Sequence, residues 1–162
     1  MAVENKYTDS NVAAGNRAIQ GRGGAELVVF EGYAAVAAAD DDGSVYRVVK
    51  DIPSSFRPVR CVVQCTAITG GTDYELGLYD RNLGAVVSKG LFMTNQTLAT
   101  ASRSLDGLAN VTVADLGARK SIADLLSLTP STAKPAYDLA LTGDTAGTAA
   151  GDVRVIMEGY MG

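Results

Sequence analysis

The sequence predicts a mainly β fold, an antiparallel β-sandwich of jelly-roll type with one short helix and an extended N-terminal arm. Three observations predict it: about seven strand-like runs, turn residues between those runs, and a helical pattern in only one place. The length of 162 residues suits one compact domain. The chain has 24 Ala and 17 Val but three Phe and no Trp, so we expect a thin core of small, often β-branched side chains.

Residues 1–24 differ in composition from the rest of the chain. They carry scattered Asn and Gly and show neither a two-residue nor a helical period. Their net charge is +1, against −5 for residues 25–162, where we expect a single β-sandwich domain. Such a segment buries too little apolar surface to offset its own ordering entropy. We therefore expect it to be either disordered or an arm that orders on a neighbouring chain, and its charge favours an acidic docking surface.

From Ala25 onward the chain alternates between strand-like runs and turns. Ala25–Ala39, with a bulge expected at Gly32, and Ser44–Ile52 flank the turn Asp40–Gly43, which predicts a hairpin. A polar stretch between residues 94 and 110 is long enough to suggest a function, and contact with a partner is one such function. The remaining expected strands are Val59–Thr69, Asp73–Tyr79, Ala85–Val87, Ala136–Thr142 and Asp152–Met161.

One helix is predicted between Asp115 and Leu126. Asp115 can cap its start, and Pro130 follows shortly after its end. Its apolar stripe predicts that it covers a face or an edge of a sheet, and consists of Leu116, Ile122, Leu125 and Leu126.

The absence of histidine excludes several enzyme classes. Ser-His-Asp and Cys-His catalysis use imidazole as the base, and most catalytic zinc sites bind through it. No phosphate-binding loop is present, and the net charge of −4 does not suit binding to duplex nucleic acid. We therefore expect no enzymatic activity, no metal, no cofactor and no direct contact with nucleic acid.

The sequence shows neither a secretory signal nor a membrane span. Its longest apolar segment, Leu27–Ala39, is interrupted at Glu31 and Gly32 and is shorter than the ~20 residues that a membrane helix needs. Cys61 and Cys65 would lie about 13 Å apart on a strand, whereas a disulfide needs Cα atoms within roughly 7 Å. We expect reduced thiols in the core, which suits a cytosolic origin.

Three groups of residues invite a chemical interpretation. Asp40, Asp41 and Asp42 could hold calcium, but they lack the alternating carboxylates of a calcium loop, so we expect a solvated hairpin tip. Ser131 and Lys134 have the Ser-x-x-Lys spacing of some acyl-transfer enzymes but lie in a loop between two prolines. Glu75 and Asp138 could imitate a glycosidase pair if their strands were adjacent; we expect them to be ordinary exposed strand positions.

Four tyrosines could form an aromatic contact surface. With no Trp to stack on a sugar ring, a protein interface is the better interpretation, because tyrosine combines apolar area with a hydroxyl that tolerates water. These residues are Tyr7, Tyr33, Tyr79 and Tyr160.

Several strand and turn segments resemble small structural proteins of tailed bacteriophages, of the head decoration or cement type. The resemblance begins at about Val45 and continues to the C-terminus, so the arm is not covered. It includes no active-site signature. The segments that carry it are VYRV at 45–48, AITGGTDYELGLY at 67–79, GAVV at 84–87, YDLALT at 137–142 and AGTAAG at 146–151.

The resemblance implies a β-sandwich subunit that decorates and stabilises a capsid by bridging capsid subunits. Its expected partners are the major capsid protein and itself, as a homotrimer, and its expected location is the exterior of the virion capsid. We expect the arm to contribute the contacts, with Tyr7, Arg17 and Arg22 as its anchors. Two alternatives remain open, a phage tail or fibre component and a glycan-binding β-sandwich module.

Overall fold

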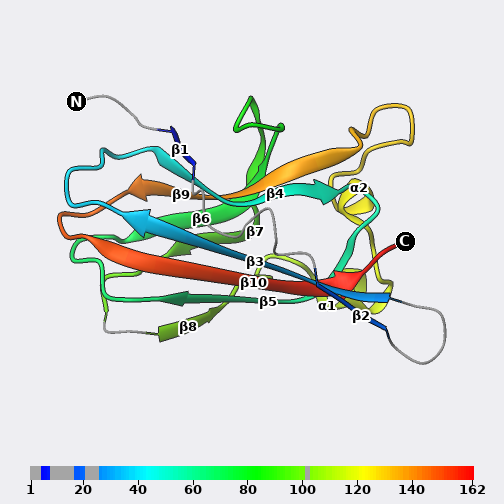
Figure 1. Ribbon diagram of the computed structural model, residues 1–162, viewed down its shortest axis with the longest axis horizontal. Helices are drawn as coiled ribbons and strands as arrows, with labels where there is room; N and C mark the ends of the chain where they lie inside the picture. The colour runs from blue at the N-terminus through cyan, green and yellow to red at the C-terminus, as the bar shows by residue number, and fades with distance from the viewer. Residues whose placement is uncertain (1–4, 8–16, 21–25, 101–102) are drawn as a thin grey trace.

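The computed structural model describes residues 5–7, 17–20, 26–100 and 103–162. They form two β-sheets packed face to face, with two short helices at one end (Figure 1). The first sheet has the strand order β1-β4-β9-β6-β7, and the second has the order β2-β3-β10-β5-β8. This arrangement confirms the predicted mainly β sandwich.

Each sheet contains strands from the beginning, the middle and the end of the chain. The first sheet consists of β1 (Asn5–Tyr7), β4 (Ser44–Pro53), β9 (Ala136–Thr145), β6 (Asp73–Tyr79) and β7 (Val86–Gln96). The second consists of β2 (Arg17–Gln20), β3 (Glu26–Val36), β10 (Gly151–Tyr160), β5 (Arg57–Cys65) and β8 (Arg103–Asp106). Neighbouring strands are antiparallel except for β1 and β4, which are parallel.

The strands from β3 to β10 form a jelly roll. β3 pairs with β10, β4 with β9, β5 with β8 and β6 with β7, so the chain is one long nested hairpin. The hairpin is rolled so that successive pairs lie in alternate sheets, and pairing of β10 with β5 and of β9 with β6 completes the two layers. Eight strands in this order make a double-sheet jelly roll, which confirms the predicted type.

Two local expectations about β3 and β4 are wrong. These strands do not form a hairpin, because they lie in different sheets and the turn at 40–43 carries the chain across the sandwich. Gly32 is not at a bulge, because its pairing with Val155 belongs to an unbroken register between β3 and β10. A Cβ at residue 32 would lie 1.6 Å from the carbonyl oxygen of Val48. Glycine there lets the backbones of the two sheets approach closely.

Two short helices stand where one was predicted. α1 (Val113–Gly117) is capped by Thr112, and α2 (Ile122–Leu125) begins with a capping box formed by Ser121 and Asp124. Arg119, between them, has a φ of 50°, which a continuous right-handed helix does not allow. Asp115 therefore lies in the first turn of α1 and is not its cap. The apolar stripe does pack as expected, with Ile122 buried and Leu116, Leu125 and Leu126 against the core.

The core contains larger side chains than the composition predicted. Three tyrosines and two phenylalanines are among its largest fully buried members, namely Tyr46, Tyr74, Tyr137, Phe56 and Phe92. The tyrosine hydroxyls reach polar partners at the margin of the core, as buried phenols usually do. Tyr46 donates to the Asp40 carboxylate, Tyr74 donates to the Ala146 carbonyl, and Tyr137 accepts from the Lys134 backbone N–H.

The two cysteines are free and buried, as expected for core thiols. Burial raises the pKa of both Cys61 and Cys65. Among the described residues no helix has the length and apolar character that crossing a membrane requires.

Candidate functional site

Both described segments of the predicted arm pair with the sandwich as edge strands. β1 runs parallel to β4 at one edge of the first sheet, with Tyr7 opposite Arg47. β2 runs antiparallel to β3 at one edge of the second sheet, with Arg17 opposite Val29. Two of the predicted anchors therefore lie on edge strands of different sheets, and the third, Arg22, lies outside the described residues. Their role as anchors stays a prediction.

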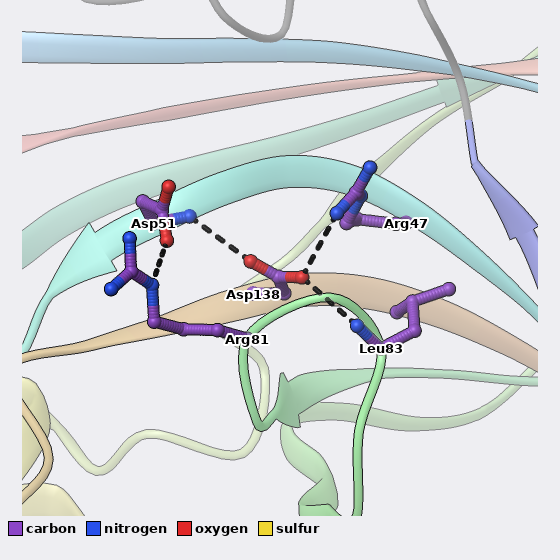
Figure 2. Close-up of polar contacts among 5 residues, drawn as sticks. All are labelled: Arg47, Asp51, Arg81, Leu83 and Asp138. Carbon is purple, nitrogen blue, oxygen red and sulfur yellow. Dashed lines mark hydrogen bonds and ion pairs between the residues drawn. The ribbon is translucent and has the colours of Figure 1, made fainter.

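A buried carboxylate organises the outer face of the first sheet near β1. The Asp138 side chain in β9 is 1% exposed and the Arg47 side chain in β4 is 6% exposed. Asp138 Oδ2 accepts from Arg47 Nη1 at 3.3 Å and from the Leu83 backbone N–H at 3.1 Å, and its Oδ1 accepts from the Asp51 backbone N–H at 3.1 Å (Figure 2). One side chain thus joins two strands and the loop at residues 80–85, which connects β6 to β7.

That loop folds over the sheet in a conformation that needs support. Asn82 and Leu83 both have positive φ values, 60° and 49°, which non-glycine residues seldom adopt. The hydrogen bond to Asp138 holds the Leu83 backbone, and the Leu83 side chain packs in a small apolar cluster with Val45, Tyr79 and Ala140. The loop therefore closes part of an outer sheet face that would otherwise be open to solvent.

An ion pair at the rim holds the neighbouring turn. Arg81 Nε contacts Asp51 Oδ1, as Figure 2 shows, and this hydrogen bond lowers the pKa of the Asp51 carboxyl. Both side chains are about half exposed, so solvent screens the pair and its net contribution is small. The buried Asp138 contacts determine the geometry here.

The two candidate glycosidase carboxylates lie on adjacent strands, yet they do not form a pair. In the pairing of β6 with β9, Glu75 is opposite Thr142 and Asp138 is opposite Tyr79. The two carboxylates are thus four residues apart along the sheet, about 13 Å, which exceeds the roughly 5–9.5 Å of glycosidase pairs. The expectation that both are exposed is wrong, because both residues are buried.

The covering of Glu75 comes from β7. A Cβ at Gly77, two residues along β6 from Glu75, would lie 2.0 Å from the carbonyl oxygen of Ser88, so β7 passes closely over that position. The register between β6 and β7 is correspondingly irregular. An edge strand that bends over its own sheet buries positions that the alternation of β6 alone would leave exposed.

Glu75 belongs to a small acidic group that a lysine neutralises in part. Oxygen atoms of Asp73, Glu75 and Asp144 lie within 4.8 Å of one another. Lys89 Nζ lies 2.5 Å from Asp144 Oδ2 and 3.3 Å from Glu75 Oε2. The hydrogen bond to Asp144 is the main reason that the pKa of Lys89 is raised. An ammonium group therefore already stands among these carboxylates.

The other chemical candidates are engaged in local structure. Lys134 Nζ contacts Asp80, and Ser131 Oγ hydrogen-bonds to the Thr129 hydroxyl, so the structure does not bring this serine and this lysine together. The expected solvated tip at Asp40–Gly43 is wrong for Asp40, which is buried and accepts from Tyr46 and from the Ala37 backbone N–H.

The predicted tyrosine surface is not continuous. Tyr33 is 40% exposed on the outer face of the second sheet, where it donates a hydrogen bond to Asp152. Tyr79 is buried against the first sheet. Tyr160 is partly covered by the Arg119 guanidinium, whose carbon lies 5.5 Å from the ring centroid. The side chain of Tyr7 lies outside the described residues.

Solved structures share this fold over nearly the whole chain. A chain from the capsid of Ralstonia phage GP4 aligns with a TM-score of 0.64 at 13% identity, covering 98% of this chain and 99% of that one. A chain from the Cyanophage Pam1 capsid asymmetric unit aligns with a TM-score of 0.51 at 18% identity, covering 95% and 99%. The sequence matches no family model and no curated protein. At these identities the likeness shows a shared fold.

Proposed function

We propose that this chain is a non-enzymatic structural protein of a bacteriophage virion. The observation that carries the proposal is the match, over nearly the full length of both chains, to a chain of the Ralstonia phage GP4 capsid. The strand and turn segments from Val45 onward independently suggested a phage structural protein. The carboxylates that could have served catalysis are instead occupied in holding strands and loops together.

Within the virion, the proposed role is to decorate and stabilise the capsid exterior by bridging capsid subunits. The proposed partners are the major capsid protein and further copies of this chain, as a homotrimer, after synthesis in the host cytoplasm. An interface of standard size removes roughly 1,600 Å² from water, and repetition over a symmetric shell multiplies a modest affinity per site. A small rigid sandwich with edge strands from its own N-terminal segment suits this role.

The location is tested on purified particles. Quantitative mass spectrometry should find the chain at a copy number comparable with that of the major capsid protein, and a map of the particle should place it on the outside of the head. A low copy number together with density at the tail would refute decoration and favour the tail or fibre role. Absence of the chain from purified particles would refute a virion role altogether.

The contribution of the arm is tested by removing residues 1–24. We expect the truncated chain to bind empty shells more weakly than the full chain does, and single alanine substitutions at Tyr7, Arg17 and Arg22 to weaken binding by smaller amounts. Glu31→Ala, which changes an exposed carboxylate on the second sheet, serves as the control. Undiminished binding by the truncated chain would remove the arm from the mechanism while leaving decoration itself intact.

A further inference from the structure

β1 is the least firmly attached strand of the first sheet. It has three residues, pairs with β4 only through residues 45–47, and runs parallel, whereas the other neighbouring pairs described are antiparallel. Hydrogen bonds contribute about 1 kcal/mol each after exchange with water. Ordering one residue costs roughly 1–2 kcal/mol. For a three-residue strand these terms nearly cancel, so its place on β4 is easily exchanged.

Without β1, residues 45–47 at the edge of β4 would offer unpaired backbone groups. The opposite edge of β4 pairs with β9 in the same sheet. An unpaired edge of this kind is a template for a strand from another chain. Every copy of the chain therefore carries both the edge of β4 and the three-residue strand that can pair with it.

The connection from β1 to β2 is longer than closure on the same molecule requires. Gly32 in β3 lies against Val48 in β4. Tyr7 pairs with Arg47 in β4, and Arg17 pairs with Val29 in β3. These two pairing positions are therefore offset by about four residues along the strands. Because the two backbones are nearly in contact at Gly32 and Val48, this offset of about 13 Å makes up most of the gap from Tyr7 to Arg17. Residues 8–16 give ten Cα steps, which can span up to about 33–36 Å.

We propose that β1 is exchanged between copies, so that β1 of one chain pairs in parallel with β4 of the next chain in the oligomer. The exchanged contacts are the same as those within one molecule, which makes exchange a low-cost route to association. Repeated in one direction around three copies, the exchange closes a ring. The inference rests on the proposed function only for its expectation of self-association.

The register gives a direct test in the full chain. Asn5 and Val45 are partners, and Cα atoms on neighbouring strands are close enough for a disulfide. The variant Asn5→Cys/Val45→Cys is oxidised and run on a denaturing gel without reductant. Exchange predicts covalent dimers and trimers that return to monomers on reduction, and a mixture of the two single variants should give a linked heterodimer. Wild type is the control for the two buried native thiols.

A cross-link confined to single chains, visible as a monomer whose two cysteines are joined, would overturn the proposal. So would the absence of any link, because β1 would then not occupy β4 of either chain. Since Val45 packs in the cluster with Leu83, a second variant leaves β4 unchanged: Asn5→Cys carrying a benzophenone maleimide. Its photoproducts should join residue 5 to a peptide from β4 of another chain, and links only within one chain would again refute exchange. Neither result depends on finding the chain in virions.

Discussion

Asp138→Ala should destabilise the fold more than any change to an exposed ion pair. The substitution removes a carboxylate that is 1% exposed and accepts from Arg47 and from the backbone N–H groups of Asp51 and Leu83. Two strands and a loop with two positive-φ residues lose their common acceptor in one step.

The magnitude follows from these contacts. A hydrogen bond to a charged group contributes about 1.5–3 kcal/mol, and breaking a buried ion pair by removing one partner costs about 3–5 kcal/mol. The contacts share one side chain, so the terms are not additive. We therefore expect the free energy of unfolding to fall by about 3–5 kcal/mol, a large part of the total stability of a typical domain.

Urea unfolding followed by circular dichroism measures the change. The matched control is Glu31→Ala, because the Glu31 pair with Arg154 also links neighbouring strands but has both side chains about half exposed; we expect a change of at most about 1 kcal/mol there. Asp138→Asn, which keeps one acceptor oxygen and loses the charge, should fall between the two. Asp138→Ala within 1 kcal/mol of wild type, or no worse than Glu31→Ala, would refute the role given to this carboxylate.

Three further predictions concern packing, pH and thiol reactivity. Gly32→Ala should lower the free energy of unfolding by at least about 3 kcal/mol or prevent folding, because its Cβ would meet the Val48 carbonyl. The control is Gly117→Ala, which has nothing near its Cβ and should be neutral or stabilising by up to about 1 kcal/mol. Equal effects of the two substitutions in urea unfolding would contradict the close approach of the sheets. Hydrogen bonds from Arg81, Lys120 and Ser121 lower the pKa values of Asp51, Asp115 and Asp124 respectively. The stabilisation that these carboxylates provide is therefore present above about pH 4 and is lost as the pH falls through their pKa values in the folded protein. The midpoint of thermal unfolding should decrease in that range, and a constant or rising midpoint would be inconsistent with this reasoning. Burial raises the pKa of Cys61 and Cys65, so a maleimide dye should leave the native protein unlabelled at neutral pH and add two labels after unfolding; rapid native labelling would show that the thiols are accessible.

The layered architecture could be predicted from the sequence because strand periodicity and turn chemistry are local signals. The topology was harder, since nothing local distinguishes a turn that closes a hairpin from one that crosses between sheets. The segment Asp40–Gly43 looks like a hairpin turn, yet a jelly roll uses it as a crossing. The single predicted helix is two helices because Thr112 and Ser121 each cap the start of one. The apolar stripe runs through both helices, so the stripe alone does not show the break between them.

The outer-face contacts could not be read from the pattern of a single strand. Asp138 stands between Tyr137 and Leu139, which face the core, so alternation correctly places it on the outer face. Its burial depends on the loop at 80–85, from a distant part of the chain. Gly32 gave a real signal, a glycine inside a strand, but a bulge and a close backbone approach share that signal. Only the contact with β4 decides between them.

The core tyrosines bear on how the molecule comes apart. The hydroxyls of Tyr46 and Tyr74 hold the chain at Asp40 and Ala146, in the β3–β4 and β9–β10 connections, while that of Tyr137 holds the segment that leads into β9. Each ring is buried in the interior, so its hydroxyl ties the connection to the hydrophobic centre. Amide exchange at Lys134, whose N–H donates to Tyr137, should accordingly be slower than exchange at other amides of the same loop, and the sandwich should unfold in a single cooperative step.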